Sequence, residues 1–326
     1  MKKYLILSLL LLHTHTVLAV TAEKPVTVTS CNRQLAFDKP PQRAVSNDIN
    51  LTEMMFALGL QKNMAGYSGV RGWQNIDSEF RAKAGNLPEI SEQSPSLESL
   101  LAIEADFLFA GWNYGLSVGG SLTPSSLEPF GIKTYELTES CIHIMKKKPS
   151  SFNDVYNDLS NLGKIFSVDE RASSLIQHYK KIITHIKGST KTDSKVSVFV
   201  YDSGKGAPFT AGRYAMPSTM IDTAGGKNVM DDIQSSWVKT SWEAVVDRNP
   251  EFIVIVDYGK ETAEDKINYL KQHPALTSIN AIINDNFVVL SYAEATPGIR
   301  NFIATQRLAE AFQPQFFATK TSVERR

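Results

Sequence analysis

The chain has 326 residues with 34 basic and 34 acidic side chains, so its formal net charge is zero. This balance excludes proteins that hold nucleic acid or an anionic membrane through a strongly basic surface. The length suffices for two domains, and the hydrophobic content of 42% is that of an ordinary globular protein.

Residues 1–22 have the composition of a secretory signal peptide. A basic start at Lys2 and Lys3 precedes an apolar run over residues 4–12, which is too short to span a membrane. Small residues at Ala19 and Ala22 offer two alternative cleavage positions. We therefore expect the mature protein to be exported.

The sequence contains two cysteines, Cys31 and Cys141. Export to an oxidising compartment favours a disulfide between them, which would stabilise the fold by at most about 4–5 kcal/mol. Two buried free thiols are the alternative. No histidine or cysteine cluster with metal-ligand spacing accompanies them, so no metal site is expected.

Strands and helices alternate in the first half of the chain. A hairpin is predicted at 25–37, and buried strands are predicted at 43–46, 64–67, 107–110 and 133–137. One helix is expected to open with a capping box at Asn50 and Glu53 and to end near residue 58. Further helices are expected at 94–103, 124–130 and 152–165.

The longest predicted helix covers residues 167–187. Ser167 and Glu170 have capping-box spacing, and apolar residues recur along one face at steps of three and four. About 20 residues make a rod of about 30 Å. Such a rod would hold two lobes at a fixed separation, with a cleft between them. An ordinary surface helix of a single domain is the alternative.

The alternation resumes after this helix. Strands are predicted at 195–201, 252–257 and 287–290, and helices at 218–224, 241–247, 263–270 and 299–312. Alternating strands and helices indicate parallel βαβ units. The expected fold is α/β, with two Rossmann-like lobes at 23–166 and 188–319, mostly parallel sheets, and a polar tail at 320–326 that frays.

An internal repeat supports two related lobes. Residues 95–109 and 240–254 each contain a serine-capped helix, a glutamate in its first turn and a following buried strand. Glu98 and Glu243 occupy equivalent positions in the two units.

Aromatic residues and arginines are concentrated just after the predicted strands, where ligands bind in open α/β sheets. Aromatic faces supply flat apolar contact, and arginines supply a fork of donors for oxygen atoms, so the pattern predicts a large, oxygen-rich, anionic ligand. Core packing or surface ion pairs are the alternative for each residue alone. The candidate ligand-binding residues are Tyr67, Arg71, Trp73, Trp112, Tyr114, Arg213, Tyr214, Tyr258, Tyr292 and Arg300, with Asp202 at a similar position.

No catalytic motif accompanies these residues. Residues 66–69 lack the spacing of a nucleophile elbow, and residues 204–209 lack the third glycine of a dinucleotide loop. The four histidines beyond the signal peptide are expected to be structural. They are His143, His178, His185 and His273. The sequence therefore predicts a binding protein without catalytic residues, metal ligands or a cofactor.

A series of short motifs extends from about residue 29 to residue 312. They lie at 41–45, 52–59, 97–101, 208–212, 221–229, 241–243 and 297–300. In this order they resemble the periplasmic substrate-binding proteins of ABC importers for iron complexes and cobalamin. The stretch 216–229 is most similar to the ferric-siderophore branch. The resemblance implies two lobes joined by one long helix, little lobe movement and a periplasmic location.

The resemblance also implies partners. A monomer would bind a ferric siderophore or a related metal chelate and deliver it to an ABC permease in the inner membrane. Glu98 and Glu243 would dock with arginines of that permease; stabilisation of their own helices is the alternative. Cobalamin or haem is the alternative ligand within the family. A secreted hydrolase or a metal chaperone is the alternative of another class.

Overall fold

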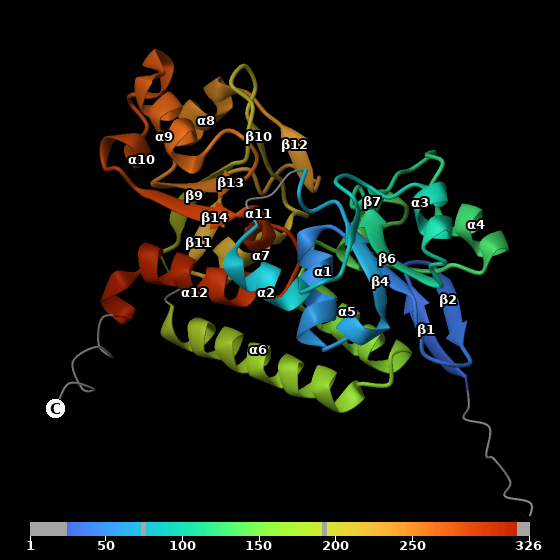
Figure 1. Ribbon diagram of the computed structural model, residues 1–326. Helices are drawn as coiled ribbons and strands as arrows, with labels where there is room; N and C mark the ends of the chain where they lie inside the picture. The colour runs from blue at the N-terminus through green and yellow to red at the C-terminus, as the bar shows by residue number, and fades with distance from the viewer. Residues whose placement is uncertain (1–24, 73–75, 191–193, 318–326) are drawn as a thin grey trace, which may run out of the picture.

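Two α/β lobes lie side by side in the computed structural model, and helix α6 (Asp169–Ser189) runs beneath both (Figure 1). The structure describes residues 25–72, 76–190 and 194–317. The predicted signal peptide, Trp73 and the tail at 320–326 lie outside these residues. The lobe boundaries and the cleavage site stay predictions.

The N-terminal lobe is built on a parallel sheet with the strand order β5-β4-β3-β6, in which β7 and β8 both pair with β6. An antiparallel hairpin of β1 (Val26–Ser30) and β2 (Arg33–Phe37) precedes it. The sheet strands are β3 (Ala44–Asn47), β4 (Met64–Ser68), β5 (Glu89–Ser91), β6 (Phe107–Trp112), β7 (Gly115–Leu116) and β8 (Lys133–Glu136).

Helices connect these strands on both faces of the sheet. The α-helices are α1 (Ile49–Ala57), α2 (Ser78–Ala84), α3 (Leu97–Ala102), α4 (Pro124–Leu127) and α5 (Phe152–Ile165). Three 3-10 helices complete the lobe: η1 (Gln61–Asn63), η2 (Glu128–Phe130) and η3 (Glu139–His143).

The C-terminal lobe has a parallel sheet of order β11-β9-β13-β14 and a separate antiparallel pair, β10 with β12. The strands are β9 (Val196–Tyr201), β10 (Phe209–Ala211), β11 (Gly226–Asn228), β12 (Trp237–Lys239), β13 (Phe252–Asp257) and β14 (Phe287–Ser291). The helices are α7 (Met216–Thr223), α8 (Trp242–Arg248), α9 (Ala263–Gln272), η4 (Pro274–Leu276), α10 (Asn280–Ile283), α11 (Tyr292–Ala295), α12 (Asn301–Phe312) and η5 (Pro314–Phe316). The predicted α/β class with mostly parallel sheets is confirmed.

The predicted capping box at Ser167 is wrong. The amide N–H of Ser167 bonds the carbonyl of Lys164, and that of Val168 bonds the carbonyl of Gly163 at 2.7 Å. This pattern is a Schellman motif, in which a left-handed residue ends a helix. Ser167 has φ 56° and therefore terminates α5, while α6 begins two residues later. Because the two helices are joined so tightly, Ser167 has no freedom to cap α6.

The predicted capping box at Asn50 and Glu53 is also wrong. Asp48 precedes α1 as its N-cap, and its Oδ1 accepts a hydrogen bond from the N–H of Ile49 at 2.7 Å. Asn50 instead donates to the carbonyl of Pro297 at 2.7 Å, and Glu53 bonds Arg300. Both side chains therefore connect α1 to a distant segment of the chain.

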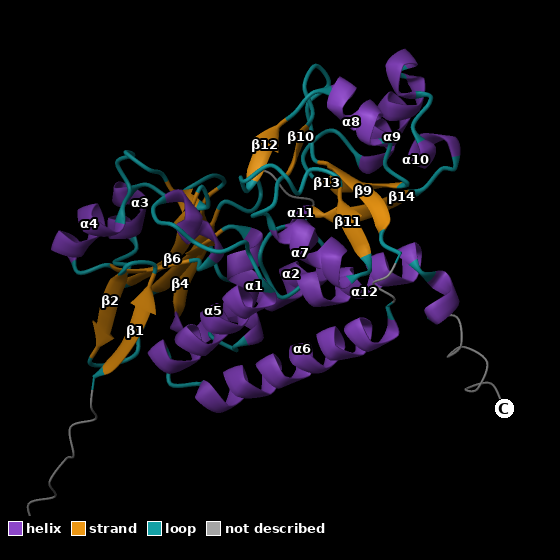
Figure 2. Cartoon of the chain, turned by 180° about the vertical axis from the view of Figure 1, so that it is seen from behind, coloured by secondary structure: helices purple, strands orange, loops and turns teal. Residues whose placement is uncertain are grey.

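Helix α6 packs along α5 and α12, as the view from behind shows (Figure 2). Its buried residues lie on one face: Ala172, Tyr179, Ile183 and Ile186. Phe302 of α12 stacks on Tyr179 with ring centroids 4.2 Å apart and on Tyr156 of α5 at 5.5 Å. Three helices thus share one aromatic stack, so α6 does not act as a free rod.

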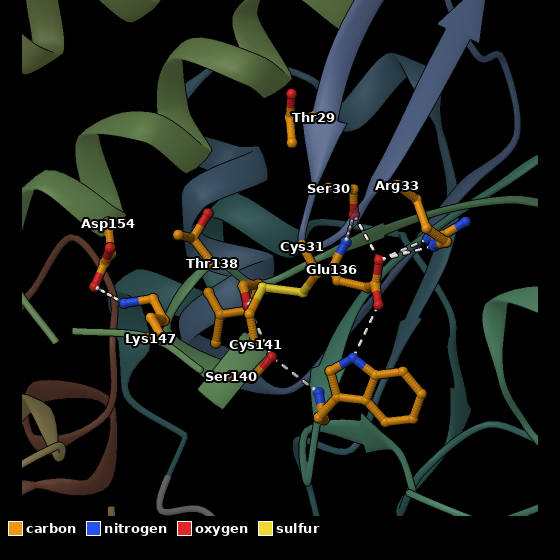
Figure 3. The surroundings of a disulfide bond; sticks show 12 residues. Thr29, Ser30, Cys31, Arg33, Glu136, Thr138, Ser140, Cys141, Lys147 and Asp154 are labelled. Atoms are coloured by element: carbon orange, nitrogen blue, oxygen red, sulfur yellow. Dashed lines mark hydrogen bonds and ion pairs between the residues drawn. A yellow bond between two sulfur atoms is a disulfide. The ribbon is translucent and has the colours of Figure 1, made fainter. Parts of the chain in front are cut away.

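A disulfide joins Cys31 to Cys141, as the sequence predicts, and ties the β1–β2 turn to η3 (Figure 3). Beside it, the buried carboxylate of Glu136 accepts hydrogen bonds from Ser30 at 2.8 Å and Arg33 at 2.7 Å (Figure 3). These contacts fix the hairpin to β8. In the part of the chain that the structure describes, no helix is long and apolar enough to cross a membrane.

We predict that Phe302→Ala lowers the free energy of unfolding by about 3–5 kcal/mol, the cost of removing a buried aromatic ring from a packed core. The neighbouring Ile303→Ala is the control, because Ile303 is 51% exposed on the same helix. Urea unfolding of both variants measures the difference. Equal, small losses would show that the aromatic stack does not hold the three helices together.

Candidate ligand-binding site

The carboxyl ends of the two sheets enclose the cleft. In the N-terminal sheet the strand order reverses between β3 and β6, and in the C-terminal sheet it reverses between β9 and β13. Ligands of open α/β sheets bind outside such switch points. Asp48 follows β3, Asn113 and Tyr114 follow β6, Asp202 follows β9, and Tyr258 follows β13.

Two adjacent cavities lie at this position. The first has a volume of about 260 Å³ and is lined by both lobes, including Tyr114, His143, Asp202, Trp237, Tyr258 and Tyr292. The second, of about 230 Å³, includes Asn47, Asp48 and Gly69. The cavities share Asn113, Tyr114, Tyr258 and Tyr292, so they form two parts of one cleft.

Aromatic rings form much of the wall of the first cavity. Phe209 and Trp237, from the paired strands β10 and β12, stack with ring centroids 6.0 Å apart. Tyr258 and Tyr292 meet edge to face at 5.7 Å. Tyr114 is buried against the same space. The wall therefore suits a ligand with flat or apolar surface.

Each of two wall tyrosines donates its hydroxyl to a buried carboxylate. Tyr292 donates to Oδ2 of Asp48 at 2.7 Å, and Tyr258 donates to Oδ1 of Asp202 at 2.7 Å. Burial raises the pKa of Asp48 to about 6 and also raises the pKa of Asp202. Burial raises the pKa of Tyr292 well above its usual value, so its phenol stays protonated and serves as a donor.

Two further groups bridge the cleft or line it. Ser236 of the C-terminal lobe donates to Oε1 of Glu139 in the N-terminal lobe at 3.2 Å, and burial raises the pKa of Glu139 to about 7. His143 lies 3.2 Å from the amide nitrogen of Asn113, and burial lowers its pKa, so it is neutral at pH 7.

The backbone is strained at the switch point of the N-terminal lobe. Asp48 has φ 74° and Asn113 has φ 67°, a region that residues other than glycine seldom adopt. Gly115 is required beside them, because a Cβ there would lie 2.8 Å from the side chain of Asn47. Strain of this kind is concentrated at ligand sites in many proteins.

Arg300 joins the two lobes. Its Nε donates to Oε2 of Glu53 at 2.7 Å, and its Nη1 lies 2.6 Å from Oδ2 of Asp77, the N-cap of α2. Burial opposes the charge on Arg300, but the bonds to the two carboxylates raise its pKa. Its guanidinium is therefore paired with carboxylates of the N-terminal lobe.

The structure brings three predicted site residues, Tyr114, Tyr258 and Tyr292, together in the cleft, along with Asp202. The other predicted residues that it describes are not among those lining the two cavities. They are Tyr67, which packs on Phe80; Arg71, paired with Glu89 at 3.0 Å; Trp112, which donates to Glu136 at 2.9 Å; Arg213, which is exposed; Tyr214, whose hydroxyl bonds Gln234 at 3.4 Å; and Arg300.

Sequence reasoning missed Asp48, His143, Phe209 and Trp237. Asp48 lies two residues after the predicted strand at 43–46, and that position was a usable signal. Phe209 and Trp237 lie on strands of three residues, which are too short for alternation to show. Among the described residues, no group of three or more His, Cys, Asp or Glu could hold a metal ion.

Glu98 and Glu243 lie in the first turns of α3 and α8, and both are exposed. Hydrogen bonds from their own backbone N–H groups, and then from Ser96 and Ser241, lower the pKa of each carboxyl. Helices α3 and α8 lie on the side of the two lobes that faces away from α6 (Figure 1). The two glutamates are therefore ionised at neutral pH and accessible to a partner.

Comparison with known families agrees with this geometry. Residues 45–293 match the family model described as "Periplasmic binding protein". The chain belongs to the periplasmic binding protein family. The predicted resemblance to substrate-binding proteins of ABC importers is thereby confirmed, and members of this family bind a small ligand for transport.

Two relatives show how far the similarity extends. An uncharacterised ABC transporter substrate-binding lipoprotein of Bacillus subtilis, YvrC, is 23% identical over 304 residues, which cover 90% of this chain and 87% of the relative. A vitamin B12-binding protein of Vibrio parahaemolyticus is 24% identical over 66% of this chain and 71% of its own length.

Solved structures share the two-lobed fold. A periplasmic binding protein of Veillonella parvula has a TM-score of 0.77 and 28% identity, covering 89% of this chain and 98% of that one. A protein of the Fe3+-hydroxamate transport system of Saccharomonospora viridis has a TM-score of 0.74 and 21% identity, covering 89% and 99%. A haem-binding protein of Pseudomonas aeruginosa has a TM-score of 0.66 and 23% identity, covering 84% and 93%.

We predict that Arg300→Ala lowers the free energy of unfolding by about 2–4 kcal/mol, because it leaves the buried carboxylate of Glu53 unpaired. Arg307→Ala is the control; Arg307 is 44% exposed in its pair with Glu294, so about 0–1 kcal/mol is expected. Thermal and urea unfolding measure both losses. A loss for Arg300→Ala no larger than the control's would contradict the role of Arg300 as a clamp between the lobes.

Proposed function

We propose that the periplasmic form of this protein binds a ferric siderophore in the cleft and delivers it to an ABC permease in the inner membrane. The observation that carries this proposal is the cavity at the two switch points, walled by aromatic rings from both lobes. The fold shared with a protein of an Fe3+-hydroxamate transport system supports it. The iron would arrive already chelated, since the described residues offer no ligand cluster for a bare metal ion.

The size of the cavity favours a compact chelate over haem or cobalamin. The volume of the first cavity, about 260 Å³, lies just below the range of about 300–1,000 Å³ that is typical of sites for drug-sized ligands. A porphyrin or corrin ring is a broad plate and would need the lobes to separate. The clamp at Arg300 and the aromatic stack at Phe302 both oppose such a separation.

We infer that the protein binds its ligand without transforming it. In the described part of the cleft, the hydroxyl of Ser236 donates to Glu139 and His143 is paired with Asn113. Among the described residues of the cleft, Ser236 and His143 do not bond each other, so they do not form the nucleophile and base of a hydrolase.

The ligand proposal is tested by the intrinsic tryptophan fluorescence of the mature protein. We expect saturable quenching by a ferric trihydroxamate, with a dissociation constant of about 1 μM or lower. Ferric citrate, a ferric catecholate, haem and cobalamin are titrated in parallel. Trp237→Phe should remove most of the change in emission, because Trp237 lines the cavity, whereas Trp242→Phe, in the core beside Tyr201, should not.

Quenching by haem or cobalamin alone would replace the siderophore with that ligand. No saturable response to any of the five compounds would contradict the proposed function.

The docking proposal concerns Glu98 and Glu243. We expect the Glu98→Ala/Glu243→Ala double variant to bind ligand normally but to lose uptake, because both carboxylates would pair with arginines of the permease. Glu170→Ala is the matched control: Glu170 is an exposed first-turn glutamate of α6, on the opposite side of the molecule (Figure 1). Transport of labelled chelate in cells that depend on this protein measures the effect. Uptake equal to that of the control would rule out the docking role.

A further inference from the structure

The charged groups that line the cleft are of one sign. Asp202 lines the first cavity and Asp48 lines the second. Glu139 lies behind Ser236, its hydrogen-bond donor at the cavity wall. Among the described residues that line the two cavities, none is lysine or arginine. The histidine of the lining, His143, has a lowered pKa because it is partly buried, and it adds no positive charge at neutral pH.

One cation lies behind the wall of the first cavity: Nζ of Lys266 is 4.5 Å from the centroid of the Tyr258 ring. Lys266 is buried, and its Nζ donates to the carbonyl oxygens of Asp202 at 2.5 Å and Val256 at 2.6 Å. Lys147 is paired with Asp154 at 2.6 Å. Lys266 partly offsets the charge of Asp202, whereas the hydrogen-bond partners of Asp48 among the described residues are a tyrosine and a backbone amide.

The aromatic wall also favours a positively charged ligand, independently of the carboxylates. The face of an aromatic ring carries negative potential and attracts cations, most strongly when water is excluded. Five rings line the first cavity: those of Tyr114, Phe209, Trp237, Tyr258 and Tyr292. A cation in this space would lie among these rings and the carboxylates, with Tyr292 and Asp48 farther along the cleft from Lys266 than Tyr258, whose ring Lys266 already contacts.

Asp48 is held in the cleft at a cost to the fold. Burial raises its pKa to about 6, and its backbone is strained at φ 74°. A cation bound beside it would offset the cost of the buried charge, whereas an anionic ligand would add repulsion. Among the described residues the partners of Asp48 are a phenol and a backbone amide, so a positive charge on the ligand would stabilise its ionised form.

We propose that the ligand carries an ammonium group that enters the cleft between the rings of Tyr258 and Tyr292 and the carboxylates of Asp48 and Asp202. This inference rests on the proposed function and specifies its substrate class as a cationic iron chelate. It differs from the anionic ligand that the sequence pattern predicts, because that expectation assigned arginines to the cleft, and the described arginines are not among its lining residues.

Three iron chelates that share one ferric centre and carry terminal groups of different charge test the proposal. Ferrioxamine B is a linear ferric trihydroxamate with a free terminal ammonium. Its N-acetylated form is uncharged, and its N-succinylated form is anionic, while the iron centre is the same in all three. Isothermal titration calorimetry at neutral pH and low salt should give a dissociation constant about tenfold lower for the ammonium form than for the acetylated form. The succinylated form should bind most weakly.

Variants that remove the charge but keep the shape identify the source of the preference. Asp48→Asn keeps an acceptor for Tyr292 and tolerates the positive φ, and Asp202→Asn keeps an acceptor for Tyr258. Each should reduce the ratio of the two dissociation constants at least threefold. Asp169→Asn, an exposed site on α6, should leave the ratio unchanged. Thermal unfolding confirms that each variant is folded.

The outcomes separate the two proposals. Tighter binding of the ammonium form that depends on Asp48 and Asp202 supports both. Equal affinities, or tighter binding of the anionic form, would overturn the cation preference and leave the siderophore function intact. No saturable binding of any of the three forms would overturn this inference and exclude ferric trihydroxamates as the siderophore, and the five-compound titration then decides the proposed function.

Discussion

The contact between α1 and the segment from Tyr292 to Arg300 is the constraint on which the rest of the molecule depends. Arg300 bonds Glu53 across 247 positions of sequence, and Asn50 bonds the carbonyl of Pro297. Tyr292 reaches Asp48 at the start of the same helix. Three polar contacts therefore fix the first turns of α1 to the C-terminal lobe. Because α1 follows β3 directly, they also set the distance between the carboxyl ends of the two sheets.

Two sets of contacts join the lobes: the ion pairs of Arg300 and the aromatic stack around Phe302. The clamp lies at the base of the cleft, and the stack joins α5, α6 and α12 beneath it. Separation of the lobes would expose a buried arginine–carboxylate pair and a buried aromatic cluster together. A cleft held in this way is preformed, so binding requires little ordering of the protein. The wall tyrosines are likewise fixed in advance by their hydrogen bonds to Asp48 and Asp202.

Most of the fold was predictable because it is encoded locally. Alternating apolar runs and helical periodicity located α6 and most strands of the two parallel sheets, but not the β10–β12 pair, and reading the residues after strands found Tyr114, Tyr258 and Tyr292. The capping boxes were predicted wrongly where a side chain bonds a residue distant in sequence or belongs to a neighbouring helix. Asn50 and Glu53 have capping-box spacing but bond residues in the other lobe, and Ser167 belongs to the end of the preceding helix. Phe209 and Trp237 were missed because a strand of three residues has no readable period.

The charge of the cleft follows from how arginines are distributed between structure and surface. Arginines near the predicted strand ends favour the prediction that the cleft binds an anionic ligand. In the folded chain, Arg300 forms ion pairs with Glu53 and Asp77, and Arg71 forms an ion pair with Glu89. The carboxylates of Asp48 and Asp202 accept hydrogen bonds from tyrosine hydroxyls, which are uncharged. The cleft is acidic and aromatic in a neutral protein because folding pairs Arg71 and Arg300 with carboxylates outside its lining and leaves Arg213 exposed, and sequence spacing does not reveal these contacts.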